Sequence, residues 1–382
     1  MPHAAGTVLC PVHGLPVEAA PSMPPPPSMP LPPAAPPGFE LPEIEIPLAA
    51  PAPPPSLIPP TEAPLVGALL EGRYRITGVI ARGGMGIVYE GVQLFLDRPV
   101  AVKCLHPRYT RDAVAIARFQ HEAQVCGGFG HPNIVEVFDM GLGEDGSPFL
   151  VMERLEGETV TQRLRQDKRL ALDLAVSIAR QTVSALAATH ARGILHRDLK
   201  PDNLFLADIA GDAPQVKVLD FGVSKVFQGD RGPKLTRAGF VMGTPAYMAP
   251  EQARGDADLD PRVDLYAVGV ILYEMLTGRI AYAARTPGTL LTEMQRGLPP
   301  RPSEGRPEVP PSLDALVMRC MSLSREDRPR DAVALQRELG SVASVIAAYA
   351  GADDEPTEVL ERAPRPPLDT HDDPPHVPTP GE

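Results

Sequence analysis

The alternation of apolar and polar residues sets a middle segment, about residues 67–350, apart from the two ends of the chain. In the first part of this segment, β-branched and aromatic residues predict short strands. These expected strands lie at residues 74–80, 87–89, 99–103, 131–137 and 148–153, and one helix is expected at about 113–126. This part is therefore predicted to be a five-stranded sheet with one helix.

The spacing of apolar residues becomes helical after Gly157. Val176, Val183 and His190 lie on one such stripe, so His190 is interpreted as a core residue rather than a ligand. Residues 265–276 are apolar on all sides, which predicts a buried helix. Two or three amphipathic helices are expected to close the domain by about residue 347. The whole pattern predicts an α+β fold.

Proline and charge distinguish the two ends from the middle. Of the 48 Pro residues, 22 fall in residues 1–66 and 8 in residues 351–382. Such segments bury too little apolar surface to offset chain entropy, so a Pro-rich disordered arm and an acidic disordered tail are predicted. The arm holds five acids and no Lys or Arg, and the tail nine acids and two Arg, which accounts for the net charge of −12. The near-neutral middle disfavours binding to nucleic acid or to an anionic membrane.

The four cysteines are scattered at positions 10, 104, 126 and 320, and are interpreted as reduced thiols. Cys10 and His13 resemble half of a zinc site, but no second pair of ligands follows nearby. The sequence has neither a signal peptide nor an apolar run of 18 residues. A cytoplasmic protein without a membrane span is expected.

The segment His196–Asn203, with the sequence HRDLKPDN, carries a carboxylate, an ammonium group and an amide at fixed offsets. Asp198 can accept the proton of a hydroxyl group, Lys200 can neutralise charge on a phosphate, and Asn203 can hold a metal ion. Asp220, in Asp-Phe-Gly, supplies a second ligand for metal. Together these groups indicate transfer of a phosphoryl group to a hydroxyl.

Glycines at positions 83, 84 and 86 connect the first two expected strands. A strand follows them rather than a helix, which separates this turn from a Walker loop and from a dinucleotide fingerprint. Glycine lets backbone N–H groups approach phosphates, so the turn is a candidate phosphate site. A simple hairpin turn is the alternative.

The order of these motifs resembles that of protein kinases, and most of all the eukaryotic-like serine/threonine kinases of bacteria, over about residues 72–345. The motifs are GGMG at 83–86, VAVK ending at Lys103, Glu122, HPNIV, HRDLKPDN, DFG, GTPAYMAPE ending at Glu251, Asp264 and Arg328. The resemblance implies a two-lobed protein-kinase fold, with a small lobe at 72–155 and a large lobe at 156–345. ATP and Mg²⁺, with Mn²⁺ as a substitute, are expected between the lobes.

The resemblance also implies a role for each catalytic residue. Lys103 is expected to bind the α- and β-phosphates of ATP and to pair with Glu122. Asp220 and Asn203 are expected to bind metal ions, and Asp198 to deprotonate the acceptor hydroxyl. The remaining nucleotide contacts that it implies are Ile80, Ala81, Gly83, Gly84, Gly86, Val88, Ala101, Met152, Glu153, Leu155, Glu158 and Phe205. Among these, the backbone of Glu153 and Leu155 is expected to bind the adenine edge.

Other residues are assigned to specificity and support by the same resemblance. Lys200 and Thr244 favour Ser or Thr as the acceptor. Glu251 and Arg328 resemble a structural ion pair of the large lobe. Asp264 resembles the acid that holds the backbone of the catalytic loop.

Regulation is expected between Asp220 and Glu251. Arg197 precedes the catalytic Asp, as in kinases that phosphorylation of the activation loop switches on. Thr236 is the preferred phosphate acceptor, and Ser224 is the alternative.

Two residues depart from the family pattern, and two other functions compete. Ala81 stands where the first glycine of the loop is usual, and Arg154 follows the expected adenine contact at Glu153, where its side chain is expected to point to solvent. The competing functions are a pseudokinase scaffold and a kinase-fold enzyme acting on small molecules. Protein substrates are expected. For the tail, a phosphothreonine-binding partner at Thr357 and a plain solvated tail are the two alternatives. For the arm, they are a Pro-motif-binding partner and a plain spacer.

Overall fold

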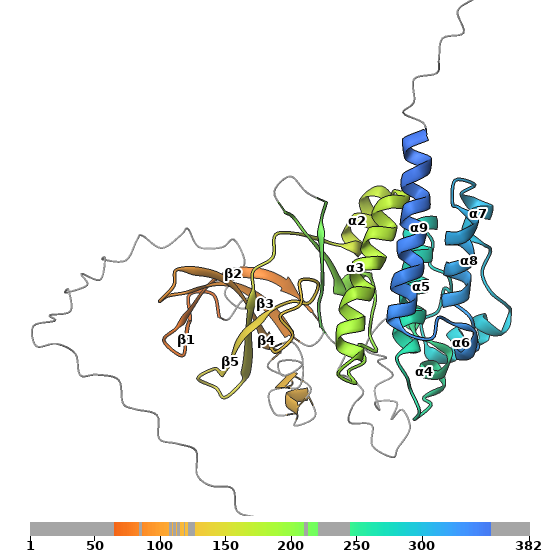
Figure 1. Ribbon diagram of the computed structural model, residues 1–382. Coiled ribbons are helices and arrows are strands. Elements are labelled where there is room, and N and C mark those ends of the chain that lie inside the picture. Colours follow the sequence, from red (N-terminus) through yellow and green to blue (C-terminus); the bar gives the residue numbers. More distant parts are fainter. Residues whose placement is uncertain are drawn as a thin grey trace, which may run out of the picture. The chain divides into compact units, whose positions relative to one another are not determined.

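The computed structural model describes residues 65–83, 86–106, 127–209, 213–220 and 245–352, together with residues 109, 112, 115–117, 119 and 120 (Figure 1). All of the Pro-rich arm except residues 65 and 66, and nearly all of the acidic tail, therefore lie outside the described residues. The same is true of most of the helix expected at 113–126, including Glu122, and of Thr236.

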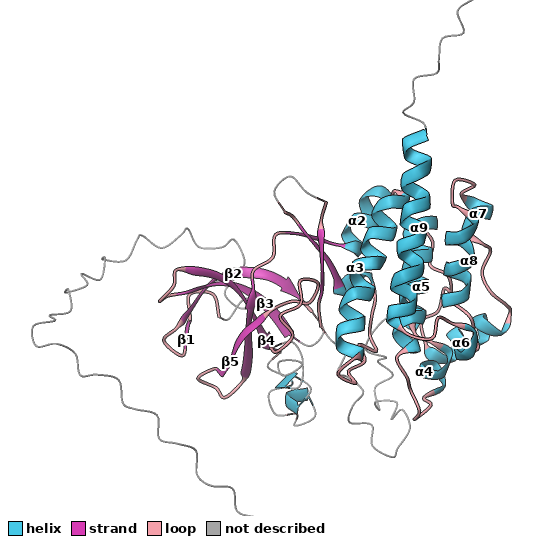
Figure 2. Ribbon diagram, viewed as in Figure 1, coloured by secondary structure: helices cyan, strands magenta, loops and turns pink. Residues whose placement is uncertain are grey.

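The first part of the described chain is an antiparallel sheet with the strand order β1-β2-β3-β4-β6-β5 (Figure 2). Its strands are β1 (Leu69–Leu70), β2 (Tyr74–Arg82), β3 (Gly86–Gln93), β4 (Arg98–Leu105), β5 (Val137–Leu142) and β6 (Pro148–Glu153). Strand β1 adds two residues at one edge, where Leu70 pairs with Tyr74. The sheet thus contains four of the five expected strands, one strand (β5) that begins only at the end of the fifth expected range, and one short strand (β1) that the pattern did not predict.

The strand expected at residues 131–137 was placed too early, since β5 begins at Val137. Pro132 has no N–H to give to a sheet. The following residues instead bond to the strand that precedes Asp220: the N–H of Val135 lies 3.2 Å from the carbonyl oxygen of Val218, and the N–H of Val218 lies 2.9 Å from that of Asn133. This segment therefore ties the sheet to the rest of the domain.

Helices make up most of the remaining chain. They are α2 (Val160–Asp167), α3 (Leu172–His190), α4 (Pro250–Arg254), α5 (Arg262–Thr277), α6 (Pro287–Gln295), α7 (Pro302–Gly305), α8 (Pro311–Cys320) and α9 (Ala332–Ala352). A small second sheet has the order β7-β8-β9, formed by Gly157–Thr159, Leu204–Ala207 and Gln215–Val218. The last helix continues five residues past the end expected from the pattern.

Helix α5 is buried, as the apolar run at 265–276 predicted. Every residue from Val263 to Tyr273 is buried, and α5 packs against α3 and α8 (Figure 1). A Cβ atom on Gly269 would lie 2.6 Å from the Cβ of Cys320, so glycine is what allows α5 and α8 to approach this closely. Within the residues that the structure covers, no helix is long and apolar enough to cross a membrane.

Candidate active site

The catalytic loop at 196–203 is held in place by a buried carboxylate on α5. The backbone N–H groups of His196 and Arg197 each lie 2.8 Å from an oxygen of Asp264, His196 at Oδ2 and Arg197 at Oδ1. The Nε2 atom of His190 lies 2.8 Å from Oδ2. Burial alone raises the pKa of Asp264, but the hydrogen bond from His190 and the neighbouring charges outweigh it and leave that pKa lowered. The carboxylate thus stays charged and fixes the start of the loop.

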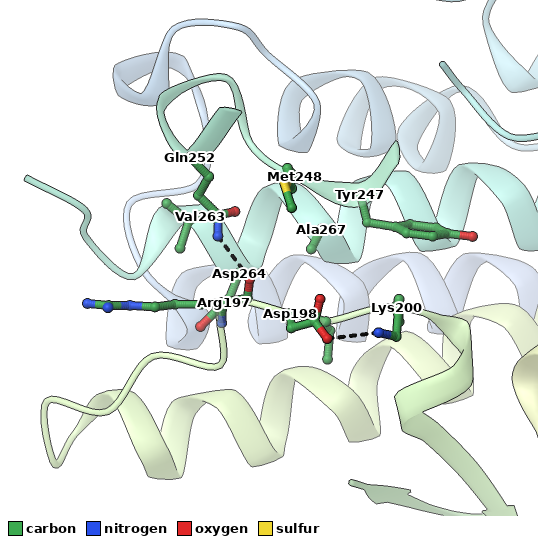
Figure 3. Close-up of a pocket in the computed structure, with 10 residues that line it drawn as sticks. Arg197, Asp198, Lys200, Tyr247, Met248, Gln252, Val263, Asp264 and Ala267 are labelled. Atoms are coloured by element: carbon green, nitrogen blue, oxygen red, sulfur yellow. Dashed lines mark hydrogen bonds and ion pairs between the residues drawn. The ribbon is translucent and has the colours of Figure 1, made fainter. Parts of the chain in front are cut away.

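Arg197 adopts a backbone conformation that non-glycine residues rarely take, with φ at 63°. Two contacts hold it there: Asp264 accepts from its N–H, and Nε2 of Gln252 donates to its carbonyl oxygen over 3.0 Å (Figure 3). Local strain of this kind costs about 1–3 kcal/mol and persists only where surrounding contacts over-determine it. The loop conformation is therefore imposed by α4 and α5.

The chemical groups of the loop lie within hydrogen-bonding reach of one another. Lys200 Nζ lies 2.8 Å from Oδ2 of Asp198 (Figure 3), and Nδ2 of Asn203 donates to the Asp198 carbonyl over 2.8 Å. The Asp198 side chain is 35% exposed, so it can be reached from solvent. A carboxylate beside an ammonium group is thus presented at an open position.

The two expected metal ligands come to the same end of a two-stranded ladder. Leu204 in β8 pairs with Val218 in β9, and one step further the N–H of Leu219 donates to the carbonyl oxygen of Asn203 over 2.9 Å. Asp220 follows directly, with a positive φ of 48°. The pair offers an amide and a carboxylate oxygen, the ligand type that Mg²⁺ prefers, so these residues fit a divalent metal ion.

Lys103 contacts Asp220 directly. Its Nζ atom lies 2.6 Å from Oδ1 of Asp220, although 117 residues separate the two in sequence. Lys103 lies in β4, is only 9% exposed, and pairs across the sheet with Val88 in β3. The lysine of the sheet and the acid after β9 therefore share one site, and the expected partner Glu122 lies outside the described residues.

Gly83 and Gly86 have different structural roles in the turn between β2 and β3. The N–H of Gly83 donates to the carbonyl oxygen of Gly86 over 2.8 Å, which closes the turn. A Cβ atom on Gly86 would overlap the carbonyl oxygen of Cys104 in β4, whereas one on Gly83 would make ordinary contact at 3.6 Å. Gly84 is outside the described residues. Ala81 lies inside β2, where it pairs with Val88, and its φ is not positive, so its methyl group is accommodated.

The sheet register brings several expected nucleotide residues together. Ala101 pairs with Met152 across β4 and β6, and Ala81 pairs with Val88 across β2 and β3. Ala101 is buried and Ile80 is 43% exposed.

Two further expected nucleotide residues lie in the second sheet. Phe205, in β8, pairs with Thr159 in β7. The Glu158 carboxylate accepts from Arg163 and Gln166 over 2.7 and 2.8 Å, so it is already held by α2.

Four contacts around the site were missed by sequence reasoning. Lys217 Nζ lies 2.7 Å from Oε1 of Glu153, and Gln252 holds Arg197 as described above. Arg154 does not simply point to solvent, because its Nη1 donates to the carbonyl oxygen of Leu155 and its Nε lies 3.2 Å from Oε1 of Glu90. In the sequence, only the unusual charge of Arg154 pointed to any of these contacts. The others gave no signal, because the partners are distant in sequence or are backbone atoms.

A small pocket lies beside the catalytic loop. It is lined by Arg197, Asp198, Lys200, Tyr247, Met248 and Gln252, with α5 behind them (Figure 3). The Tyr247 hydroxyl donates to Oε2 of Glu274 over 2.7 Å, and burial raises the pKa of Glu274. Thr244, just before this segment, is outside the described residues.

A family model described as "Protein kinase domain" matches residues 74–339, and the chain therefore belongs to the protein kinase family. Members of this family use ATP and a divalent metal ion. The family match agrees with the arrangement of Lys103, Asp198, Asn203 and Asp220.

Curated relatives are bacterial kinases. The chain is 42% identical over 280 residues to the serine/threonine-protein kinase pkn3 of Myxococcus xanthus, a match covering 72% of this chain and 51% of that protein. It is 40% identical over 295 residues to Pkn1 of the same organism, covering 77% and 42%. PknL of Mycobacterium tuberculosis is 37% identical over 284 residues, covering 74% and 69%. The chain thus spans about half the length of the first two relatives.

Solved structures show the same fold. The crystal structure of the Mycobacterium tuberculosis PknI kinase domain matches with a TM-score of 0.56 and 26% identity, covering 72% of this chain and 98% of that one. The two-lobed fold expected from the motifs is thereby confirmed.

Proposed function

We propose that this chain is a serine/threonine protein kinase, which transfers the γ-phosphoryl group of ATP to Ser or Thr hydroxyl groups of proteins. The observation that carries the proposal is the convergence of Lys103, Asp220, Asn203 and Asp198 through short contacts between distant segments. The loose transition state of this reaction needs positioning and charge stabilisation rather than a protein nucleophile. This set of groups supplies both.

Each group has one task in the proposed reaction. Asp198 orients the acceptor hydroxyl and receives its proton. Lys200, 2.8 Å from Asp198, balances charge on the transferred group. Lys103 binds the phosphates that stay behind. A Mg²⁺ ion held by Asp220 and Asn203, with Mn²⁺ as a substitute, neutralises phosphate charge when it is bound.

The test compares wild-type and Asp198→Asn protein with labelled ATP, Mg²⁺ and a generic protein substrate. We expect Asp198→Asn to lower kcat about 100-fold to 10,000-fold, the usual contribution of a positioned general base, with nucleotide binding unchanged. Asp256→Asn, at an exposed Asp after α4, is the matched control and should keep full activity. Nucleotide binding without transfer by the wild type would favour the pseudokinase scaffold instead.

Activation is proposed to follow phosphorylation of Thr236, a residue outside the described part of the chain. The phosphate would pair with Arg197, whose backbone is fixed by Asp264 and Gln252. We expect Thr236→Ala to lower turnover about tenfold, the loss of one charge-assisted contact, and mass spectrometry to find phosphate at Thr236 in the wild type. Unchanged turnover and unchanged loop phosphorylation in Thr236→Ala would contradict this proposal. Phosphate found at Ser224 instead would assign the regulatory site to Ser224.

We place the reaction in the cytoplasm, the compartment that supplies ATP and keeps thiols reduced. The described thiols are consistent with this location, since Cys104 and Cys320 are buried free cysteines, and burial raises the pKa of each to about 12. The tails are proposed as sites for a phosphothreonine-binding or Pro-motif-binding partner. Partner capture that survives deletion of residues 1–64 and 353–382 would refute that role.

A further inference from the structure

We propose that Arg154 makes the nucleotide site selective for adenine over guanine by occupying the carbonyl group of Leu155. The inference rests on the proposed nucleotide site, in which the backbone of Glu153 and Leu155 binds the base. Arg154 directly follows β6 and lies between these two residues. Its Nη1 donates to the Leu155 carbonyl oxygen, so the guanidinium group sits against the backbone that would read the base.

The guanidinium group is anchored from the sheet. Nε of Arg154 lies 3.2 Å from Oε1 of Glu90, and the two side chains are 26% and 45% exposed. Glu90 pairs with Ala101, and Ala101 pairs with Met152, so the anchor and the base-binding segment belong to three adjacent strands. An exposed ion pair of this kind adds little to stability. What it provides is a fixed orientation for Nη1.

Adenine does not need the group that Arg154 occupies. Its Watson–Crick edge presents one donor, the 6-amino group, and one acceptor, N1. The carbonyl of Glu153 can accept from the amino group, and the N–H of Leu155 can donate to N1. The Leu155 carbonyl is left over, and Arg154 can take it without cost to ATP.

Guanine cannot form two favourable hydrogen bonds with the same three backbone groups, the Glu153 carbonyl and the N–H and carbonyl of Leu155. In the adenine position, its O6 would face the Glu153 carbonyl and its N1–H would face the Leu155 N–H, so both contacts are repulsive. Shifted to put O6 on the Leu155 N–H, it needs the Leu155 carbonyl as the acceptor for N1–H. Arg154 already donates to that oxygen and takes one of its two lone pairs, and the positive charge of the guanidinium group beside the second lone pair repels the partial positive charge of the incoming N1–H. One unmet hydrogen bond corresponds to about a tenfold loss in affinity.

The experiment measures kcat/KM of the full chain with ATP and with GTP. We expect Arg154→Met, which keeps length but removes the donors and the charge, to raise the GTP/ATP ratio of kcat/KM about tenfold. The value for ATP itself should stay within about threefold, less than one hydrogen bond is worth. Arg154→Lys keeps the charge but loses the planar fork, so its ratio should lie between the two. Arg319→Met, at an arginine that pairs with Glu338 between α8 and α9, is the matched control and should leave the ratio unchanged.

Binding is measured separately so that a failure of the proposed activity can be recognised. ADP and GDP affinities are determined for Asp198→Asn protein with and without Arg154→Met. A shift in the GDP/ADP ratio, together with no phosphate transfer by the wild-type protein, would sustain the role of Arg154 and refute the kinase proposal. An unchanged ratio in binding and turnover, or an equal loss for both nucleotides, would overturn the inference, as would the absence of any nucleotide binding.

Discussion

A single buried carboxylate, Asp264, sets the geometry of the catalytic loop. It is 1% exposed and accepts from two successive backbone N–H groups and from His190. Each oxygen has a donor aimed at it, so the negative charge is compensated by directed hydrogen bonds. The unusual backbone of Arg197 depends on one of these bonds. The position of Asp198 next along the chain is therefore decided by a residue 66 positions away.

Replacing this carboxylate is expected to destabilise the protein in a pH-dependent way. Asp264→Asn offers one acceptor where two are needed, so one buried N–H faces an NH₂ group. We expect the free energy of unfolding at pH 7 to fall by about 1–3 kcal/mol. The pKa of Asp264 is lowered below 3.8, so its stabilising contribution is present above that pH and is lost as the pH falls through the folded-state value. Urea unfolding between pH 7 and pH 3 should therefore show a constant gap to wild type above about pH 4 and a narrowing gap below it.

The control for this prediction is Asp256→Asn, at an exposed position. It should unfold as the wild type does at every pH. A gap for Asp264→Asn that stays constant down to pH 3 would mean that the lost contacts do not depend on the charge.

Strand β3 approaches β4 so closely at one end that a side chain is excluded. The two strands pair from Gly86 with Leu105 to Gln93 with Arg98, and the pair Val88 and Lys103 lies within this ladder. The Gly86 position overlaps the Cys104 carbonyl for any residue with a Cβ atom, while the Gly83 position does not. The lysine of the site is therefore placed by a ladder whose first step requires glycine.

Gly86→Ala should push β3 away from β4 and displace Lys103 from the position at which we propose that it binds the phosphates of ATP. Misplacement of a positioning group by about 1 Å can cost up to about 100-fold, and we expect at least a tenfold rise in the KM for ATP. Gly83→Ala is the matched control, because its Cβ meets only an ordinary 3.6 Å contact, and should change KM less than threefold. Equal effects of the two substitutions would show that loop conformation, rather than the strand approach, governs nucleotide binding.

The large lobe depends on one buried ion pair that joins segments from across the sequence. Nη1 of Arg328 lies 2.6 Å from Oε1 of Glu251, Nη2 lies 2.9 Å from Oε2, and both residues are buried. Arg328 also donates to the carbonyl oxygens of Ser322 and Arg262. The pair and these bonds connect α4 with the start of α5 and the chain after α8.

Removing one partner is expected to cost far more than removing both. Arg328→Met leaves the Glu251 carboxylate buried and unpaired, and we expect a loss of about 3–5 kcal/mol in the free energy of unfolding. The double variant with Glu251→Met should recover part of this loss. Arg319→Met, at a half-exposed pair, should change stability by less than about 1 kcal/mol when unfolding in urea is measured for all of these variants. An Arg328→Met variant as stable as the wild type would show that water reaches the Glu251 carboxylate.

The local sequence was sufficient for the family and for the elements with strong periodicity. The order of the motifs around HRDLKPDN predicted the protein kinase family, and the apolar run at 265–276 predicted the buried helix α5. It was insufficient where partners are remote. The segment at 131–137 was expected to be a strand, but residues 133–135 pair with Val218 instead.

What the sequence by itself determined is the set of reactive groups, their order along the chain and the family, because these follow from residue identity and short spacings. The tertiary structure decided which groups meet: Lys103 with Asp220, Asp264 with the loop backbone, and Arg154 with Leu155 and Glu90. The physical reason is that such contacts form when packing brings together segments whose separation in sequence carries no periodic signal. Strain at Arg197 and the close approach at Gly86 likewise depend on neighbours supplied only by the folded chain.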